Sequence, residues 1–163
     1  MPVHTIAPVF DKDSRVLILG SFPSVLSRKT EFFYGHPQNR FWQVLSQVFG
    51  LPLPVNVEEK RELLYASHVA VWDVIASCDI TGSSDSSITN VVPNDISRIL
   101  DFCDIRAIFA NGQTAGRLYQ KFIYPKTGRE ATVLPSTSPA NAAFSLERLC
   151  EVWAQIGDYG QSI

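Results

Sequence analysis

The chain is poor in cysteine and has no excess of basic residues. Its three cysteines, Cys78, Cys103 and Cys150, lie far apart and form no CxxC pair. This spacing argues against a disulfide framework, a zinc finger and a four-cysteine iron–sulfur site, so we expect buried, reduced thiols. The formal net charge of −2 excludes blanket neutralisation of nucleic acid, which requires a basic protein. Any nucleic-acid role must therefore use a local patch and backbone donors.

Long apolar runs are also absent. No run approaches the roughly 18 residues that cross a bilayer, and residues 1–14 hold neither a cationic n-region nor a continuous apolar h-region. We therefore expect a cytoplasmic protein with no membrane partner. Hydrophobic residues make up 45% and charged residues 18% of the chain, which is typical of a globular protein. A length of 163 residues predicts one domain spanning residues 1–163.

The chain does contain four short apolar segments, at residues 15–20, 69–75, 105–110 and 130–134. Their apolarity is continuous, which is typical of strands buried on both faces of a parallel sheet. Helical patterns separate them, at residues 39–49, 57–66, 95–103, 112–122 and 140–156. The alternation predicts an α/β protein, a three-layer α/β/α sandwich with a central four-stranded parallel sheet. Residues 77–92 are small and polar, which predicts a surface loop.

The most informative segment is the first strand together with the residues just after it. The strand RVLILG runs into the turn SFPS, residues 21–24, and then into FYGHPQNRFW, residues 33–42. A tight turn, aromatic rings, a histidine, an amide and an arginine thus come after one buried strand. Ligands bind at the carboxyl edge of open parallel sheets, so we expect the chemistry to lie there.

Five motifs occur in a fixed order along most of the chain: LILGSFPS, FYGHPQNRFW, VAVWDV, IFANGQTAG and LPSTSPAN. Together they resemble the uracil-DNA glycosylase superfamily, and within it the hypoxanthine-DNA glycosylase branch, also called family 6 or DNA-deoxyinosine glycosylase. The resemblance implies a monofunctional enzyme that flips a deaminated base, chiefly hypoxanthine, out of double-stranded DNA. It would hydrolyse the N-glycosidic bond without a metal or cofactor. We expect DNA as the partner and a monomeric enzyme.

The chain departs from the superfamily pattern at three positions. Phe22 stands where an Asp or Asn normally positions the attacking water, and the resemblance to the hypoxanthine branch moves this catalytic role to Asn39. Leu134 stands where a His often stabilises the departing uracil anion, which argues against efficient uracil excision. Asp73 replaces an Asn that reads uracil; an ionised carboxylate accepts hydrogen bonds and so suits the N1–H of hypoxanthine.

Each candidate base-contacting residue has a structural alternative. Asn39 is also a good helix cap, and the two roles are compatible. The backbone N–H groups of Gly20, Ser21 and Phe22 are candidates for contacting the base or its developing charge, with Pro23 completing the substrate-binding turn, or the turn serves loop geometry alone. Either Phe33 or Tyr34 stacks on the flipped base, or both belong to the core. His36 contacts substrate or orders its turn, and Asp73 reads the base or joins a buried structural pair.

The DNA-contacting candidates lie in the late motif. Its polar residues, Ser136, Thr137, Ser138 and Asn141, are predicted to open the final helix, whose N-terminus would favour a phosphate; ordinary capping is the alternative. The resemblance implies that this turn pinches the DNA backbone and enters the gap left by the flipped base. Arg40 is a candidate for contacting a DNA phosphate, as are Arg28, Lys29 and Arg148. The alternative for each is a charged side chain that only faces solvent.

Other functions stay open from the sequence. One is a mismatch-type uracil/thymine-DNA glycosylase of the same superfamily. Another is a serine hydrolase using Ser21 or Ser24 with His36, which the absence of a GxSxG elbow disfavours. A third is a non-catalytic nucleotide-binding module of flavodoxin-like architecture. Lyase chemistry would need a pocket lysine, and Lys29 matches no family position, so we expect an intact abasic strand as product.

Overall fold

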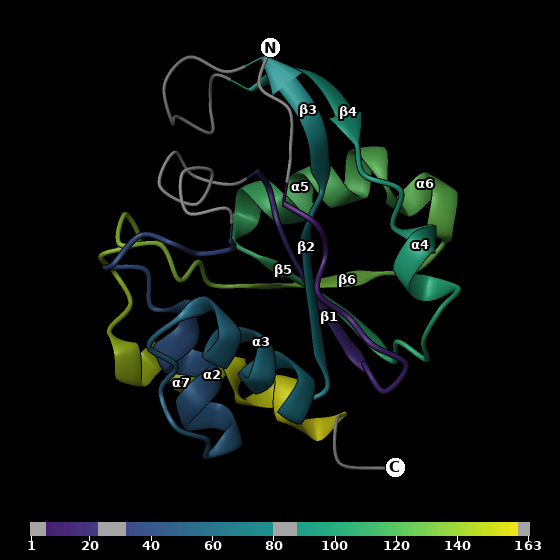
Figure 1. Ribbon diagram of the computed structural model, residues 1–163. Coiled ribbons are helices and arrows are strands. Elements are labelled where there is room, and N and C mark those ends of the chain that lie inside the picture. The colour runs from purple at the N-terminus through teal and green to yellow at the C-terminus, as the bar shows by residue number, and fades with distance from the viewer. Residues whose placement is uncertain (1–5, 23–31, 80–87, 160–163) are drawn as a thin grey trace.

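A four-stranded parallel sheet forms the centre of the computed structural model, which describes residues 6–22, 32–79 and 88–159. The strand order is β2-β1-β5-β6 (Figure 1). The strands are β1 (Val16–Gly20), β2 (Val69–Asp73), β5 (Ala107–Asn111) and β6 (Ala131–Leu134). The predicted α/β class with a central four-stranded parallel sheet is confirmed.

Helices cover both faces of this sheet. Figure 1 shows α2, α3 and α7 grouped on one side, with α5 and α6 on the other. The helices are α2 (Phe41–Phe49), α3 (Val57–Ala66), α4 (Ser97–Leu100), α5 (Gln113–Phe122), α6 (Tyr124–Thr127), α7 (Leu146–Trp153) and the 3₁₀ helix Ala154–Asp158. None of the helices in the described ranges is long and apolar enough to cross a membrane.

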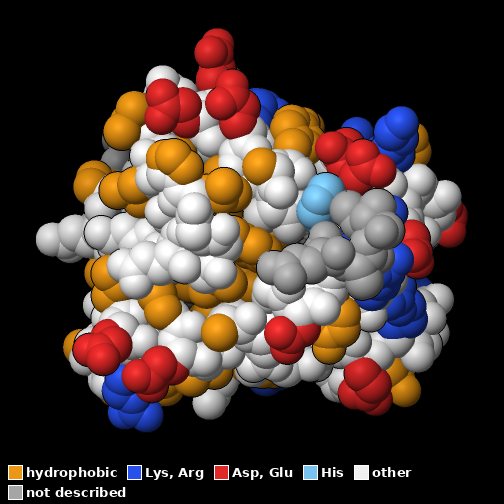
Figure 2. Space-filling view, turned by 90° about the horizontal axis from the view of Figure 1, so that it is seen from below, with side chains coloured by type: hydrophobic (Ala, Val, Ile, Leu, Met, Phe, Trp, Pro, Cys, Tyr) orange, Lys and Arg blue, Asp and Glu red, His pale blue; other side chains and the backbone are white. Residues whose placement is uncertain are grey.

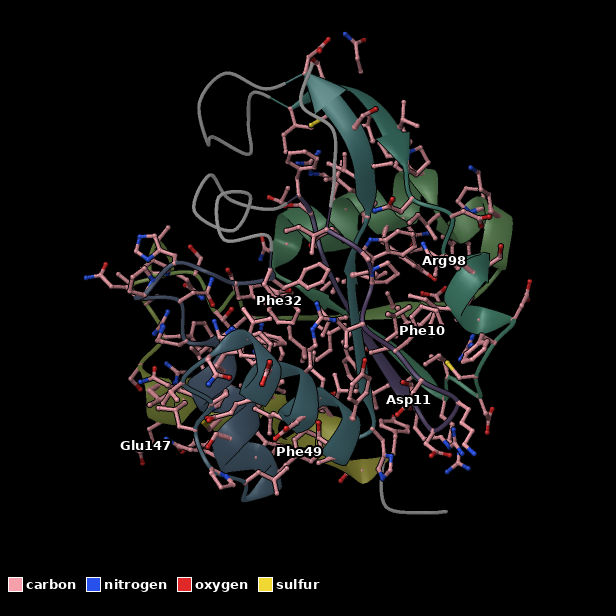
Figure 3. The ribbon with its side chains drawn as sticks, viewed as in Figure 1. Phe10, Asp11, Phe32, Phe49, Arg98 and Glu147 are labelled. Carbon is pink, nitrogen blue, oxygen red and sulfur yellow. The ribbon has the colours of Figure 1, made fainter. Side chains whose placement is uncertain are left out.

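The core lies on both sides of β1. All five residues of β1 are buried, and so are all five of β2, as expected for strands with helices on both faces. In Figure 3, Phe32 lies between the group of α2 and α3 and the sheet. It is 1% exposed and stacks on Trp42 with ring centroids 5.9 Å apart. Because Trp42 belongs to α2, this aromatic packing fixes the segment that precedes α2 against that helix.

The predicted surface loop at residues 77–92 is wrong in part. Residues on either side of the undescribed stretch 80–87 form β3 (Ile75–Asp79) and β4 (Thr89–Pro93), which pair antiparallel as a separate two-stranded sheet. The Asn94 side chain donates to the carbonyls of Asp73 (2.9 Å) and Ile75 (3.2 Å), and so fixes the exit of β2. Most of β4 is exposed or half-buried, so these strands lack the apolar pattern that revealed the others.

The predicted final helix begins too early. α7 starts at Leu146, because the Ser145 side chain accepts a hydrogen bond from the Arg148 N–H (3.2 Å) and caps it there. The polar residues of the late motif therefore lie in a loop of residues 135–145, not at the helix N-terminus. The helix predicted at residues 95–103 is likewise shorter, Ser97–Leu100.

No field of one sign covers the face shown in Figure 2. Acidic and basic side chains both occur there, at separate places around apolar ones. This distribution agrees with the formal net charge of −2. Attraction to a polyanion would therefore come from individual placed cations and backbone dipoles.

Candidate active site

The carboxyl ends of the four parallel strands meet at one edge of the sheet. Gly20 ends β1, Asp73 ends β2 and Asn111 ends β5, while Leu134 ends β6 and leads into the loop 135–145. The register pairs Gly20 with Asp73, and Asn111 with Leu134. A glycine, a carboxylate and an amide thus lie on neighbouring strands, at the edge where the sequence predicts a ligand site.

Asn39 is held from two sides. Its Oδ1 accepts hydrogen bonds from the Phe41 N–H (3.0 Å) and from Thr137 Oγ1 (2.8 Å). The first of these forms a turn just before α2, but the N-cap residue of that helix is Arg40, which makes no side-chain capping bond, so Asn39 is not the helix cap expected as its structural alternative. The second links the HPQNR segment to the LPSTSPAN segment across 98 residues. Two of the five motifs that carry the resemblance are therefore in direct contact.

Asn111 was not predicted from the sequence as a site residue. Its Nδ2 donates to Thr137 Oγ1 (3.0 Å), and its Oδ1 accepts from the Thr137 N–H (3.1 Å). Since Thr137 Oγ1 accepts from Asn111, its proton is directed to Asn39, which gives a one-way series from Asn111 through Thr137 to Asn39. Thr137 is fully buried. A polar residue ending an apolar strand, as in IFANG, was the signal that could have found Asn111.

The other polar residues of the late loop bond mainly to their own loop. Ser136 Oγ accepts from the Ser138 N–H (3.1 Å), and Ser138 Oγ accepts from the Ala140 N–H (3.1 Å). Asn141 Nδ2 donates to the Ser136 carbonyl (3.0 Å). The Arg40 side chain donates to three carbonyls of this loop. These bonds shape the loop. DNA contact stays a prediction for all five candidates, which are Ser136, Thr137, Ser138, Asn141 and Arg40.

Asp73 and Tyr34 lie together above the end of β1. Asp73 is 3% exposed. A Cβ on Gly20 would lie 2.3 Å from Asp73 Oδ1 and 3.2 Å from the Tyr34 hydroxyl oxygen, so only glycine leaves room for both. Burial raises the pKa of the Tyr34 hydroxyl, the Asp73 carboxylate raises it further, and the nearby Asn111 side chain lowers it. Tyr34 thus connects the Asp73 side of the site to the Asn111 side.

The two candidate stacking residues differ in position. Phe33 is 2% exposed and belongs to the core. Tyr34 is half-buried, and its ring stacks on Phe41 with centroids 4.0 Å apart and an interplanar angle of 19°. Its φ of 52° is in the left-handed region, which is uncommon outside glycine and recurs at functional sites. The Trp42 indole N–H donates to the Tyr34 carbonyl (3.3 Å) and supports this conformation.

The remaining candidates lie around this centre or outside the described ranges. His36 orders its turn: its Nδ1 accepts from the Gln38 N–H (3.0 Å) and its carbonyl from the Asn39 N–H (2.9 Å). Ser21 and Phe22 come directly after β1, and the Ser21 carbonyl accepts from the Ile75 N–H (3.0 Å). Pro23, Ser24, Arg28 and Lys29 lie outside the described residues. No group of three or more His, Cys, Asp and Glu side chains comes together as a metal site in the described part of the chain.

Replacing Tyr34 with phenylalanine should change how stability depends on alkaline pH. The Tyr34 hydroxyl is buried and makes no hydrogen bond to a described residue, so its loss should cost little stability at neutral pH. A tyrosine in the unfolded chain ionises near pH 10, whereas the raised pKa keeps Tyr34 neutral in the folded chain. Tyr34 therefore lowers stability as pH rises past about 10, by up to about 1.4 kcal/mol per pH unit.

Urea unfolding of both proteins from about pH 9 to about pH 11 measures this difference. The Tyr34→Phe variant should lose stability less steeply than the parent above about pH 10. Tyr119, whose pKa burial also raises, is unchanged in the variant and keeps its share of the slope. Equal slopes in the two proteins would show that Tyr34 ionises normally.

Three comparisons connect this arrangement to known proteins. The family model described as the uracil DNA glycosylase superfamily matches residues 7–157. A Methanosarcina acetivorans protein named hypoxanthine DNA glycosylase is 36% identical over 145 residues, covering 88% of this chain and 90% of the relative. A Methanosarcina barkeri protein of the same name is 32% identical over 150 residues, covering 91% and 93%.

A solved structure is similar as well. The solution NMR structure of a candidate uracil DNA glycosylase from Methanosarcina acetivorans superposes with a TM-score of 0.80 and 34% identity. The match covers 93% of this chain and 94% of that one.

Proposed function

The chain belongs to the uracil DNA glycosylase superfamily, and from this premise we infer that it is a base-excision repair glycosylase that removes hypoxanthine from DNA. The observation that carries the choice of base is that two relatives similar over most of their length are named for hypoxanthine. The reaction breaks the bond between C1′ and N9 of deoxyinosine. The bonding electrons leave with the base, a water oxygen bonds to C1′, and the proton that this water loses passes, directly or through solvent, to the departing base anion.

Asn39 is proposed to place that water. Its Oδ1 already accepts two hydrogen bonds, one for each lone pair, so its Nδ2 is the end left to contact a water. A water that accepts a hydrogen bond from Nδ2 keeps both its protons and one lone pair for attack. This suits a dissociative path, in which the sugar becomes cationic before attack and little base strength is needed.

Asp73 is proposed to select the base. A buried carboxylate that accepts the N1–H of hypoxanthine would instead face the N1 lone pair of adenine, and two acceptors repel. Adenine would therefore be rejected by the same atom that binds its deaminated product. Tyr34, with its ring stacked on Phe41, is the better placed of the two aromatics to contact the flipped base, since Phe33 is in the core.

Incubation with duplex oligonucleotides tests the proposal. Strands carrying hypoxanthine, uracil, xanthine or ethenocytosine are treated with enzyme and then with alkali, beside an undamaged adenine control. We expect cleavage of the hypoxanthine strand after alkali and none before it, since the enzyme is proposed to be monofunctional. A preference for uracil or mismatched thymine would favour the alternative branch of the superfamily. No abasic site on any substrate would overturn the proposal.

The serine hydrolase alternative receives no support from the geometry. In the described residues no hydrogen bond joins Ser21 to His36, and His36 Nδ1 is occupied by the Gln38 N–H. Ser21→Ala should therefore leave base release nearly unchanged. A monomeric state, a cytoplasmic location, and catalysis without metal or cofactor are retained as proposals from the sequence.

A further inference from the structure

The Arg40 side chain gathers the late loop, residues 135–145, in the sense that it donates hydrogen bonds to several of its carbonyls. Its Nη2 donates to the carbonyls of Ser138 (3.0 Å) and Asn141 (3.0 Å), and its Nη1 donates to the carbonyl of Phe144. The acceptors lie 98 to 104 residues away in the chain and come from three points of a single loop. The planar fork of a guanidinium can reach three such acceptors at once, which a lysine ammonium on a flexible stem cannot do with the same geometry.

Within residues 6–22, 32–79 and 88–159, no carboxylate forms an ion pair with this guanidinium. The salt bridge found among the described residues joins Arg106 and Asp104, at the other end of the sheet, and Arg40 is held by carbonyl dipoles alone. Arg40 Nε is buried and has no hydrogen-bond partner in the described part of the chain. Arg40 is half-buried, and both its Nη1 and its Nη2 are engaged by loop carbonyls, so the guanidinium is committed to the loop rather than left free for a phosphate.

The same residue is tied to the proposed water site. The Arg40 N–H donates to the Thr137 carbonyl (3.0 Å), while Thr137 Oγ1 donates to Asn39 Oδ1 (2.8 Å). Asn39 and Arg40 thus bind the side chain and the backbone of one buried threonine. Any displacement of the loop that Arg40 gathers would be transmitted to the Asn39 amide through these bonds.

We propose that Arg40 is a positioning residue: by gathering the carbonyls of residues 138–144 it sets the Asn39 amide, so that the DNA-contacting loop and the water site move as one unit. This inference rests on the proposed function of Asn39. It assigns Arg40 a task different from direct phosphate contact, and the two tasks have opposite kinetic consequences. Loss of a phosphate contact weakens binding, whereas loss of positioning slows the chemical reaction in the bound complex, because the water is no longer in place to capture the cationic sugar.

Arg40→Lys and Arg40→Met, assayed in single turnover on a hypoxanthine duplex, separate the two tasks. We expect Arg40→Lys to lower the saturating rate constant by about ten- to a hundredfold, since a misplacement of about 1 Å at a reacting centre can cost about a hundredfold. The concentration giving half the maximal rate should change by less than about threefold, because DNA binding rests on other contacts. The slope of log affinity against log salt should stay the same in Arg40→Met, whereas a lost phosphate contact lowers it by about 0.9.

Coupling to Asn39 is tested in a double-mutant cycle. If Arg40 acts through Asn39, then Arg40→Lys should have almost no further effect on the rate of an Asn39→Ala enzyme. Equal effects of Arg40→Lys in both backgrounds would indicate a general structural role and overturn the proposal. So would a parent-like rate in Arg40→Lys combined with a reduced salt slope in Arg40→Met.

Arg129→Lys is the matched control. Arg129 also donates to a backbone carbonyl, that of Ile105 (2.7 Å), but lies away from the strand ends that form the site. It should show the cost of the same substitution without any change in the rate of base release. Failure of the parent enzyme on every base would count against the proposed function, whereas an active parent with an unaffected Arg40→Lys would count against this inference alone.

Discussion

Replacing Asn39 with alanine should lower the single-turnover rate of hypoxanthine release by about two to three orders of magnitude, the range seen when a group that positions or activates a reactant is removed. The variant loses the amide proposed to hold the water, while the loop and Asp73 remain. DNA binding should therefore persist, and competition with a fluorescent duplex measures it. An Asn39→Ala enzyme with parental activity would remove Asn39 from the mechanism.

The control for this experiment is Asn56→Ala. Asn56 also orders the start of a helix, since its Oδ1 accepts from the Glu59 N–H (2.8 Å), and it lies at α3, outside the motifs that form the site. Both variants should lose about 1 kcal/mol of stability through the lost turn or cap. Only Asn39→Ala should lose activity. Equal activity losses would mean that the defect of Asn39→Ala is one of folding.

Gly20→Ala should have the second large effect. The new methyl group would lie 2.3 Å from Asp73 Oδ1, closer than any van der Waals contact allows, so the carboxylate must move. Because Asp73 is buried at a strand end, we expect a stability loss of about 1–3 kcal/mol. Excision of hypoxanthine should fall by about a hundredfold, since the group proposed to read the base is displaced. Urea unfolding and the duplex assay measure the two losses.

Two further variants show whether the clash is the cause. In Gly157→Ala the new methyl would meet Val48 at 3.6 Å and Phe49 at 4.0 Å, which are ordinary contacts, so stability and activity should stay near parental values. In a background of Asp73→Ala the clashing oxygen is gone, and Gly20→Ala should cost far less stability there than in the parent. An equal cost in both backgrounds would contradict a steric cause.

The sheet could be predicted because its strands are buried on both faces. A continuous apolar run as short as VLILG is too short for a buried helix and too apolar for a surface strand, and the order of strands and helices then determined the architecture. The pairing of β3 with β4 was missed because no residue of β4 is buried and only two of the five residues of β3 are, so neither strand shows a continuous apolar run. These strands form a sheet of their own, and the Asn94 side chain holds the start of β3 through the Asp73 and Ile75 carbonyls. No local sequence pattern reveals either feature.

The sequence could predict those site residues whose polarity differs from that of their neighbours in the chain or that belong to a recognisable motif. Asp73 stood out as a carboxylate in an apolar strand, and Asn39 through the motif that carries it. The roles of Thr137 and Arg40 did not stand out, because hydroxyls and arginines in a loop are ordinary and these roles arise only from contacts made 98 residues away. The start of α7 was also mispredicted. Ser145 caps this helix, and the earlier candidate caps Ser136, Thr137 and Ser138 do not.

The position of the site at four strand ends has a consequence for how activity appears during folding. The Asn39 amide is fixed only when Thr137 arrives from beyond the last strand, and Thr137 in turn needs Asn111. These are contacts of high sequence separation, which form slowly and late. Under the proposed role of Asn39, a nascent or partly unfolded chain that has formed every apolar strand would still be inactive, because the hydrogen bonds that hold the Asn39 amide are not yet made.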